Sequence, residues 1–169
     1  MSFTIGIDVG VTGAIAVISQ RSGEVIALHD LPLMTWGKTK WIDAVELCRV
    51  LRDAREGHPA HAYVEHTQSM GKAGMLAASS KGLTLGSTLA ALQFAGIPFE
   101  LVVPAVWKRA LGLIAKDSTD GEKKLASLSR ARMLFPTADL DRVKDHNRAE
   151  ALLIAHYGQR YAKPLKSAA

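Results

Sequence analysis

Three carboxylates stand beside or inside segments that otherwise carry apolar residues. Asp8 lies within "TIGIDVGVTGAIAVI", and Glu65 ends the short apolar segment "AHAYVEH". Glu150 opens an apolar run in which Leu153 and Ile154 are expected to face the core. An ionised carboxylate in a buried strand is costly unless it is paired or bound to a metal ion. The three acids are therefore candidate ligands of a common site.

A divalent cation would relieve the repulsion between carboxylates that the fold brings together. Oxygen-only ligands favour Mg²⁺, with Mn²⁺ as a substitute, over Zn²⁺. The segment "KDHNRAE" offers further polar groups one turn before Glu150, where His146 and Asn147 lie roughly 40–60° from it around a helix axis. Asp145 reaches the same site if it stands in the first turn or at the cap of that helix.

Each of these residues also has an ordinary structural interpretation. Asp8 can serve as a turn residue bonded to the backbone of "VGVTG", and Glu65 and Glu150 can be surface acids. Asp145 can be a helix N-cap, and His146 a solvated polar residue. The combination of two strand acids with one helix acid favours a metal site over these separate interpretations.

The pattern of elements predicts how the acids are positioned. Short apolar segments with turns between them, "FTIGIDV", "GAIAVIS" and "EVIALHDLP", indicate an antiparallel meander. Helical spacing of Trp41, Val45 and Leu51 predicts a helix that Gly57 closes. Two more strands, "AHAYVEH" and "IPFELVVP", alternate with predicted helices in "LTLGSTLAALQFAG", "AVWKRALGL", "EKKLASLSRARMLFP" and "HNRAEALLIAHYGQRYA". "QSMGKAGMLAASSKG" is predicted to be a loop, and "IAKDSTDGEKK" a polar, mobile segment.

This order predicts an α/β fold with a five-stranded mixed sheet flanked by helices. The first strand is expected at the centre, next to the strand that ends at Glu65. Residues 1–162 are expected to form one domain, and residues 163–169 a disordered tail.

Composition is that of a water-soluble protein without disulfides. The chain has 169 residues, a net charge of +5 and a lone cysteine, Cys48. The basic charge favours a polyanionic partner. We expect a cytoplasmic protein, in a bacterium or a phage-infected host, since neither a signal peptide nor a membrane span is apparent.

The stretches "IGIDVGVTGAIAVI", "AYVEHTQSM", "VVPAVWKRALGL" and "KDHNRAEALLIAHYG" together resemble the RuvC-type Holliday junction resolvases, especially their phage-encoded and plastid branch. The resemblance covers nearly the whole chain. It implies a ribonuclease-H-like fold, a homodimer, and Mg²⁺-dependent nicking of four-way DNA junctions in recombination and repair.

The resemblance also assigns site residues. Asp8 and Glu65 match the two strand carboxylates of the family, and Glu150 matches its last helix carboxylate. The chain departs from the family at Asn147, where bacterial members usually have an Asp. Asp145 is taken as the substitute fourth ligand, with His146 as the alternative. Two metal ions about 3.5–4 Å apart would then hold the scissile phosphate.

Contacts with DNA are expected around this site. Lys108 matches a family segment in which a lysine approaches the scissile phosphate. The loop after Glu65 could place an amide or apolar side chain between bases at the junction. The predicted DNA contacts are Gln68, Met70, Lys72, Lys81, Lys116, Lys123 and Lys124.

Three other functions remain open on the sequence. A sugar-kinase or actin-like ATPase shares the "IGIDxGxTG" pattern, but it needs a second lobe and a second phosphate loop. A related nuclease could act on RNA–DNA hybrid or other branched DNA. A non-catalytic module that binds junctions is the third alternative, and the intact acid set argues against it.

Overall fold

The computed structural model describes residues 1–66, 75–114, 119–142 and 144–162. The elements in chain order are β1 (Phe3–Asp8), β2 (Ala14–Ser19), β3 (Val25–Asp30), β4 (Leu33–Trp36), β5 (Thr39–Ile42), α1 (Ala44–Arg55), β6 (Ala60–Glu65), α2 (Met75–Ala95), β7 (Phe99–Val102), α3 (Pro104–Ala110), α4 (Asp120–Leu134) and α5 (His146–Arg160).

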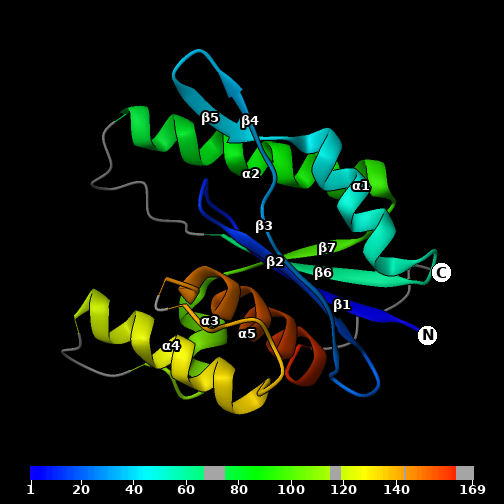
Figure 1. Ribbon diagram of the computed structural model, residues 1–169, viewed down its shortest axis with the longest axis vertical. Coiled ribbons are helices and arrows are strands. Elements are labelled where there is room, and N and C mark those ends of the chain that lie inside the picture. The colour runs from blue at the N-terminus through cyan, green and yellow to red at the C-terminus, as the bar shows by residue number, and fades with distance from the viewer. Residues whose placement is uncertain (67–74, 115–118, 143, 163–169) are drawn as a thin grey trace.

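The main sheet has five strands in the order β3-β2-β1-β6-β7, so β1 is its central strand (Figure 1). β1 pairs antiparallel with β2 and parallel with β6, and β6 pairs parallel with β7. This arrangement confirms the predicted meander and the predicted mixed sheet. It also confirms that the strands ending at Asp8 and Glu65 are neighbours.

The sheet separates two helical layers, with α1 and α2 on one face and α3, α4 and α5 on the other (Figure 1). Side chains alternate between the faces of a strand. Ile5 and Ile7 of β1 therefore pack with Leu47 of α1 in one core, whereas Gly6 faces α5. By the same alternation Asp8 lies on the α5 face of the sheet.

Glycines let α5 lie close to the sheet. A Cβ atom on Gly6 would be 2.1 Å from the carbonyl oxygen of Ala151 in α5. A Cβ atom on Gly158 would be 2.1 Å from the ring of Tyr63 in β6. The helix that carries Glu150 is thus held against the two strands that carry the other acids.

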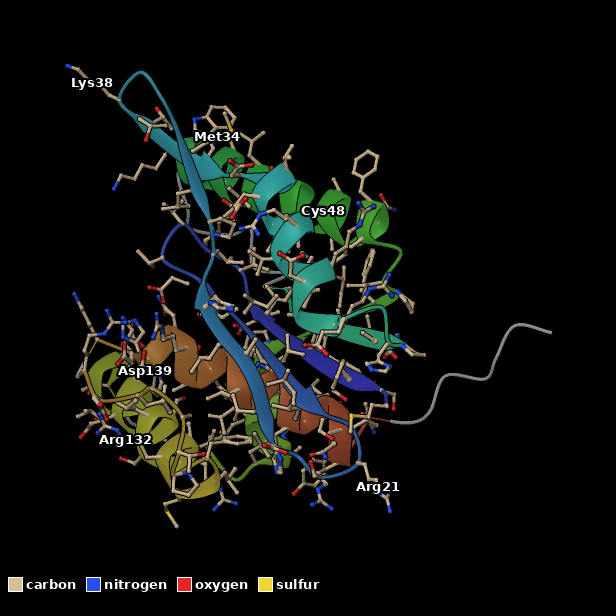
Figure 2. The ribbon with its side chains drawn as sticks, turned by 45° about the vertical axis from the view of Figure 1, so that its right-hand side comes forward. Arg21, Met34, Lys38, Cys48, Arg132 and Asp139 are labelled. Atoms are coloured by element: carbon tan, nitrogen blue, oxygen red, sulfur yellow. The ribbon has the colours of Figure 1, made fainter. Side chains whose placement is uncertain are left out.

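The β4–β5 hairpin was not expected from the sequence patterns, and it corrects the start of the first helix. Figure 2 shows Lys38 at the tip of this hairpin, pointing away from the rest of the molecule. Trp41 belongs to β5 and not to a helix. The side chain of Asp43 accepts hydrogen bonds from the amides of Val45 and Glu46, so α1 begins at Ala44. This N-cap outweighs the helical spacing of Trp41.

Two other predicted segments differ in the structure. The prediction of a loop through residue 82 is wrong from Met75 onward, where α2 begins. The predicted mobile segment contains the start of α4, because Thr119 and Glu122 form a capping box. The predicted tail, residues 163–169, lies outside the described residues. Within the described part of the chain, no helix combines the length and the apolar character needed to cross a membrane.

Candidate metal and active site

Asp8 and Glu65 end two adjacent parallel strands. Ile7 pairs with Val64 in the register of β1 and β6, so each acid is one residue further along its strand. The carboxyl ends of parallel strands meet at one edge of a sheet, which is where open α/β sheets form their sites. The backbone therefore brings these two carboxylates together before any contribution from the helices.

The third carboxylate comes from α5. One oxygen each of Asp8, Glu65 and Glu150 can be chosen so that all three atoms lie within 4.8 Å of one another. All three residues are partly buried. This is the acid cluster that the sequence predicts, and Leu153 and Ile154 in the next turn of α5 are fully buried as expected.

The cluster makes its own carboxylates reluctant to ionise. Burial raises the pKa of Asp8 well above its ordinary value, and the charges of Glu65 and Glu150 raise it further. Burial and the charge of Glu150 also raise the pKa of Glu65, against smaller lowering effects from the charge of Lys108 and from the contact with the Asp8 side chain. Without a cation the site therefore favours proton uptake.

Lys108 supplies the positive charge nearest to these acids. Its Nζ atom on α3 lies 2.8 Å from Oε1 of Glu150, and both side chains are largely buried. Its charge lowers the pKa of Asp8 and of Glu65. The structure thus places Lys108 at the cluster, where it is paired with Glu150, and its expected approach to the scissile phosphate stays a prediction.

The residues fit a divalent metal ion. Three oxygen donors converge, and they carry more negative charge than one lysine neutralises. Burial, together with repulsion from the neighbouring acids, raises the pKa of Asp8 and of Glu65. Hard cations such as Mg²⁺ and Mn²⁺ prefer such carboxylate oxygens. The donor set thus supports a divalent cation at this edge of the sheet.

Asp145 is not brought to the three acids, contrary to the expectation that it supplies a fourth ligand. It is 2% exposed, and its carboxylate accepts hydrogen bonds from the backbone amide and the Nε atom of Arg142, at 2.8 and 2.7 Å. Burial raises the pKa of Asp145, but the hydrogen bonds and charge of Arg142 hold it below its ordinary value. This acid is already satisfied by an arginine.

His146 and Asn147, which follow Asp145 at the start of α5, make different contacts from it. Burial, followed by the charge of Lys124, lowers the pKa of His146, while the charges of Glu150 and Asp145 act in the opposite direction. The lowered pKa favours the neutral form of the His146 imidazole. Asn147 donates a hydrogen bond from Nδ2 to the carbonyl oxygen of Thr12. The amide that departs from the family pattern thus ties α5 to the turn after Asp8.

The predicted DNA contacts fall into two groups. Gln68, Met70, Lys72 and Lys116 lie outside the described residues. Lys81 is exposed on α2, and Lys123 and Lys124 are exposed on α4. Lys123 lies 3.6 Å from Asp120 in an exposed pair, and Lys124 is near enough to His146 to lower its pKa. Lys124 is thus the predicted contact that the structure places beside the acid-bearing end of α5.

Comparison with known proteins gives structural but not sequence matches. No protein-family model matches the chain, and neither does any curated protein. The chain is similar to RuvC of Thermus thermophilus in complex with a Holliday junction substrate, at 23% identity and a TM-score of 0.63, with 92% of this chain and 90% of that chain covered. A second Thermus thermophilus RuvC structure matches at 24% identity and a TM-score of 0.62, with 90% of each chain covered.

The chain has the fold of RuvC. This confirms the ribonuclease-H-like fold class that the sequence resemblance implies. The matches with RuvC span about nine-tenths of both partners.

Ser127 is a site residue that the sequence patterns do not reveal. It lies on α4, is fully buried, and its Oγ atom donates to Oε1 of Glu150 at 3.0 Å. A serine in the amphipathic stretch "EKKLASLSRARML" carries no signal of its own. The sequence offers one indication. Ser127, which follows Lys124 and precedes Leu128, occupies a position on α4 where the apolar face of the helix would be expected to carry an apolar residue.

The raised pKa of Asp8 predicts how metal-free stability depends on pH. A carboxyl whose pKa is raised on folding stabilises the native state below its ordinary pKa of about 4, and that stabilisation is lost as the pH rises through the raised value. In a chelator, the melting temperature of the wild type relative to Asp8→Asn should therefore fall as the pH increases from about 4 to about 8. Thermal unfolding across this range measures the difference, and a difference independent of pH would contradict the assignment.

Proposed function

We propose that this protein is a RuvC-type endonuclease that nicks four-way DNA junctions with the help of divalent metal ions. The observation that carries the proposal is the convergence of Asp8, Glu65 and Glu150 at the carboxyl ends of β1 and β6. The same fold occurs in a RuvC that has been determined in complex with a Holliday junction substrate. The phage and plastid branch, and the host, remain predictions from the sequence resemblance.

The chemistry follows from the acid cluster. Asp8, Glu65 and Glu150 would hold Mg²⁺, or Mn²⁺ in its place. The chemistry that such a metal would supply is a water molecule of lowered pKa, able to attack phosphorus, and stabilisation of the charge that develops on the phosphate. The bond that breaks joins phosphorus to the 3′ oxygen, and the products are a 5′-phosphate and a 3′-hydroxyl.

The protein's own groups would position and neutralise the reacting strand. Lys108 is 2.8 Å from Glu150 and can instead donate to a phosphate oxygen that enters the site. A neutral His146, one turn before Glu150, is the better candidate for a fourth group than Asp145, whose carboxylate is bound to Arg142. It could accept a proton from the attacking water or bind the metal.

A homodimer belongs to this proposal. A four-way junction contains two equivalent strands, and a two-fold dimer would supply one site for each. The outward face of α2 supports it, because Gly82 and Gly86 leave open space there and Leu83 and Phe94 are 49% and 74% exposed. Small residues on a helix permit close approach of a second helix, and exposed apolar residues beside them favour burial.

A panel of matched substrates tests the proposed function. Four-way junctions, flaps, Y-shaped DNA and RNA–DNA hybrids would share one arm sequence and be incubated with Mg²⁺ or Mn²⁺. We expect paired nicks in opposite strands of the junction, at least about tenfold faster than any cut in the other substrates, and no cleavage in a chelator.

Two results would replace the proposal by one of its alternatives. Faster cleavage of the hybrid or of another branched DNA would indicate the related nuclease. Tight junction binding without cleavage in either metal would indicate a non-catalytic module.

A further inference from the structure

We propose that Ser127 is a positioning residue for Glu150, acting on the metal site through a buried hydrogen bond from α4. The inference rests on the proposed metal-dependent function of the acid cluster. It adds a residue from a helix that contributes none of the three carboxylates.

Two donors from different helices meet at one oxygen of Glu150. Lys108 Nζ on α3 lies 2.8 Å from Oε1, and Ser127 Oγ on α4 lies 3.0 Å from the same atom. Within the described part of the chain no protein donor reaches Oε2. A carboxylate has about four lone-pair sites, so two donors on Oε1 leave Oε2 available to a cation.

The hydroxyl of Ser127 differs from the other buried hydroxyls on helices in the acceptor to which it donates. Buried hydroxyls on helices commonly donate to the carbonyl four residues earlier. Thr84 and Thr88 of α2 do so, to the carbonyl oxygens of Ser80 and Thr84, both at 2.8 Å. Ser127 is equally buried, yet its hydroxyl crosses to another helix and donates to Glu150. The hydrogen bond of Ser127 therefore contributes to the position of Glu150 and not to the backbone hydrogen bonding of α4.

Glu150 needs such a support more than the other two acids do. Asp8 and Glu65 stand on adjacent strands that the register of the sheet holds together, whereas Glu150 reaches the site from a helix packed on the face of the sheet. Partners that hold a ligating carboxylate in place typically change metal affinity about 10–100-fold when they are removed. Lys108 can leave Glu150 for a phosphate, but Ser127 is fully buried and would stay.

The test is a double-mutant cycle on Mn²⁺ binding, measured by calorimetry with Mn²⁺ alone and no DNA. Ser127→Ala should weaken Mn²⁺ binding about tenfold. In a Glu150→Gln background the same change should alter the affinity less than about twofold, because the positioned group is already gone. Thr88→Val is the matched control, since it removes a buried hydroxyl bond on the opposite face of the sheet and should leave Mn²⁺ affinity within about twofold.

The outcomes separate this inference from the proposed function. Unchanged Mn²⁺ affinity in Ser127→Ala, or the same loss in the Glu150→Gln background, overturns the role of Ser127 while leaving the metal site intact. If Thr88→Val weakens Mn²⁺ binding as much as Ser127→Ala does, the loss is a general packing effect, and the role of Ser127 is overturned as well. Absence of saturable Mn²⁺ binding by the wild type overturns the proposed function itself. Ser127→Cys, which keeps a weak donor of similar size, should retain an affinity between those of the wild type and Ser127→Ala.

Discussion

Asp8→Asn should reduce junction cleavage by at least about a thousandfold while leaving junction binding within a few fold of the wild type. The pKa of Asp8 is raised well above its ordinary value, first by burial, and the residue lies on the central strand of the sheet. An amide has nearly the same shape but carries no charge, so it is a much weaker ligand for a hard cation than a carboxylate is. Single-turnover cleavage of a labelled junction, with binding measured in Ca²⁺ or a chelator, separates the two effects.

A matched control is available for this substitution. Asp141→Asn removes an exposed aspartate from the loop before α5 and should change the cleavage rate less than about twofold. Cleavage by Asp8→Asn at a rate near that of the wild type would place the reacting phosphate elsewhere. Loss of cleavage and junction binding together, with the fold intact, would show that Asp8 serves binding and not catalysis.

Gly6→Ala should destabilise the native state by at least about 3 kcal/mol, or prevent folding. The added Cβ would lie 2.1 Å from Ala151 O and 2.3 Å from Ala155 N. Both atoms belong to the backbone of α5, which cannot rotate away as a flexible side chain can. Relief would require α5 to move off β1 as a unit. Urea unfolding monitored by circular dichroism measures the change in the free energy of unfolding.

The same substitution at an open position provides the control. A Cβ on Gly121, in the first turn of α4, meets no atom within 4 Å, so Gly121→Ala should be neutral or stabilising by up to about 1 kcal/mol. If Gly6→Ala proved as stable as Gly121→Ala, the close contact between α5 and β1 would be wrong. Any folded Gly6→Ala protein should also bind Mn²⁺ more weakly, because Glu150 would move with α5.

Residues whose positions follow from strand order and register could be predicted from the sequence. Asp8 and Glu65 each end an apolar segment, and adjacent parallel strands must bring such ends together. Glu150 was predictable because the apolar run that begins beside it fixes which face of α5 meets the sheet. These are backbone-level properties, which apolar patterning records directly.

Contacts between individual side chains that have several possible partners could not be predicted from the sequence. Asp145 and the Arg142 that binds it are three residues apart, yet their pairing depends on the chain path before α5. Ser127 contacts Glu150 from a different helix, and no periodicity marks that contact. The β4–β5 hairpin was missed because its strands have four residues each and Trp41 also fits a helical spacing.

Ion pairs and a hydrogen bond hold the first turn of α5, which carries Asn147, against the sheet. Arg148, which follows Asn147, lies 2.7 Å from Asp30 of β3 and 2.7 Å from Asp139 in the connection before α5. Figure 2 shows Asp139 and Arg132 on the α4 side of the molecule. Together with the bond from Asn147 to Thr12, these pairs fix the first turn of α5 to the sheet. The first turn of α5 is therefore held to the sheet by contacts with the protein.

The most direct test of the account is the position of Mn²⁺ in crystals of the wild-type protein. Anomalous scattering from Mn²⁺ should give a peak at coordination distance from carboxylate oxygens of Asp8, Glu65 and Glu150, about 2.0–2.3 Å away. The same soak of Asp8→Asn should lose that peak. An Mn²⁺ peak at Asp145, or no peak among the three acids when the crystals contain saturating Mn²⁺, would contradict the proposed metal site and the mechanism built on it.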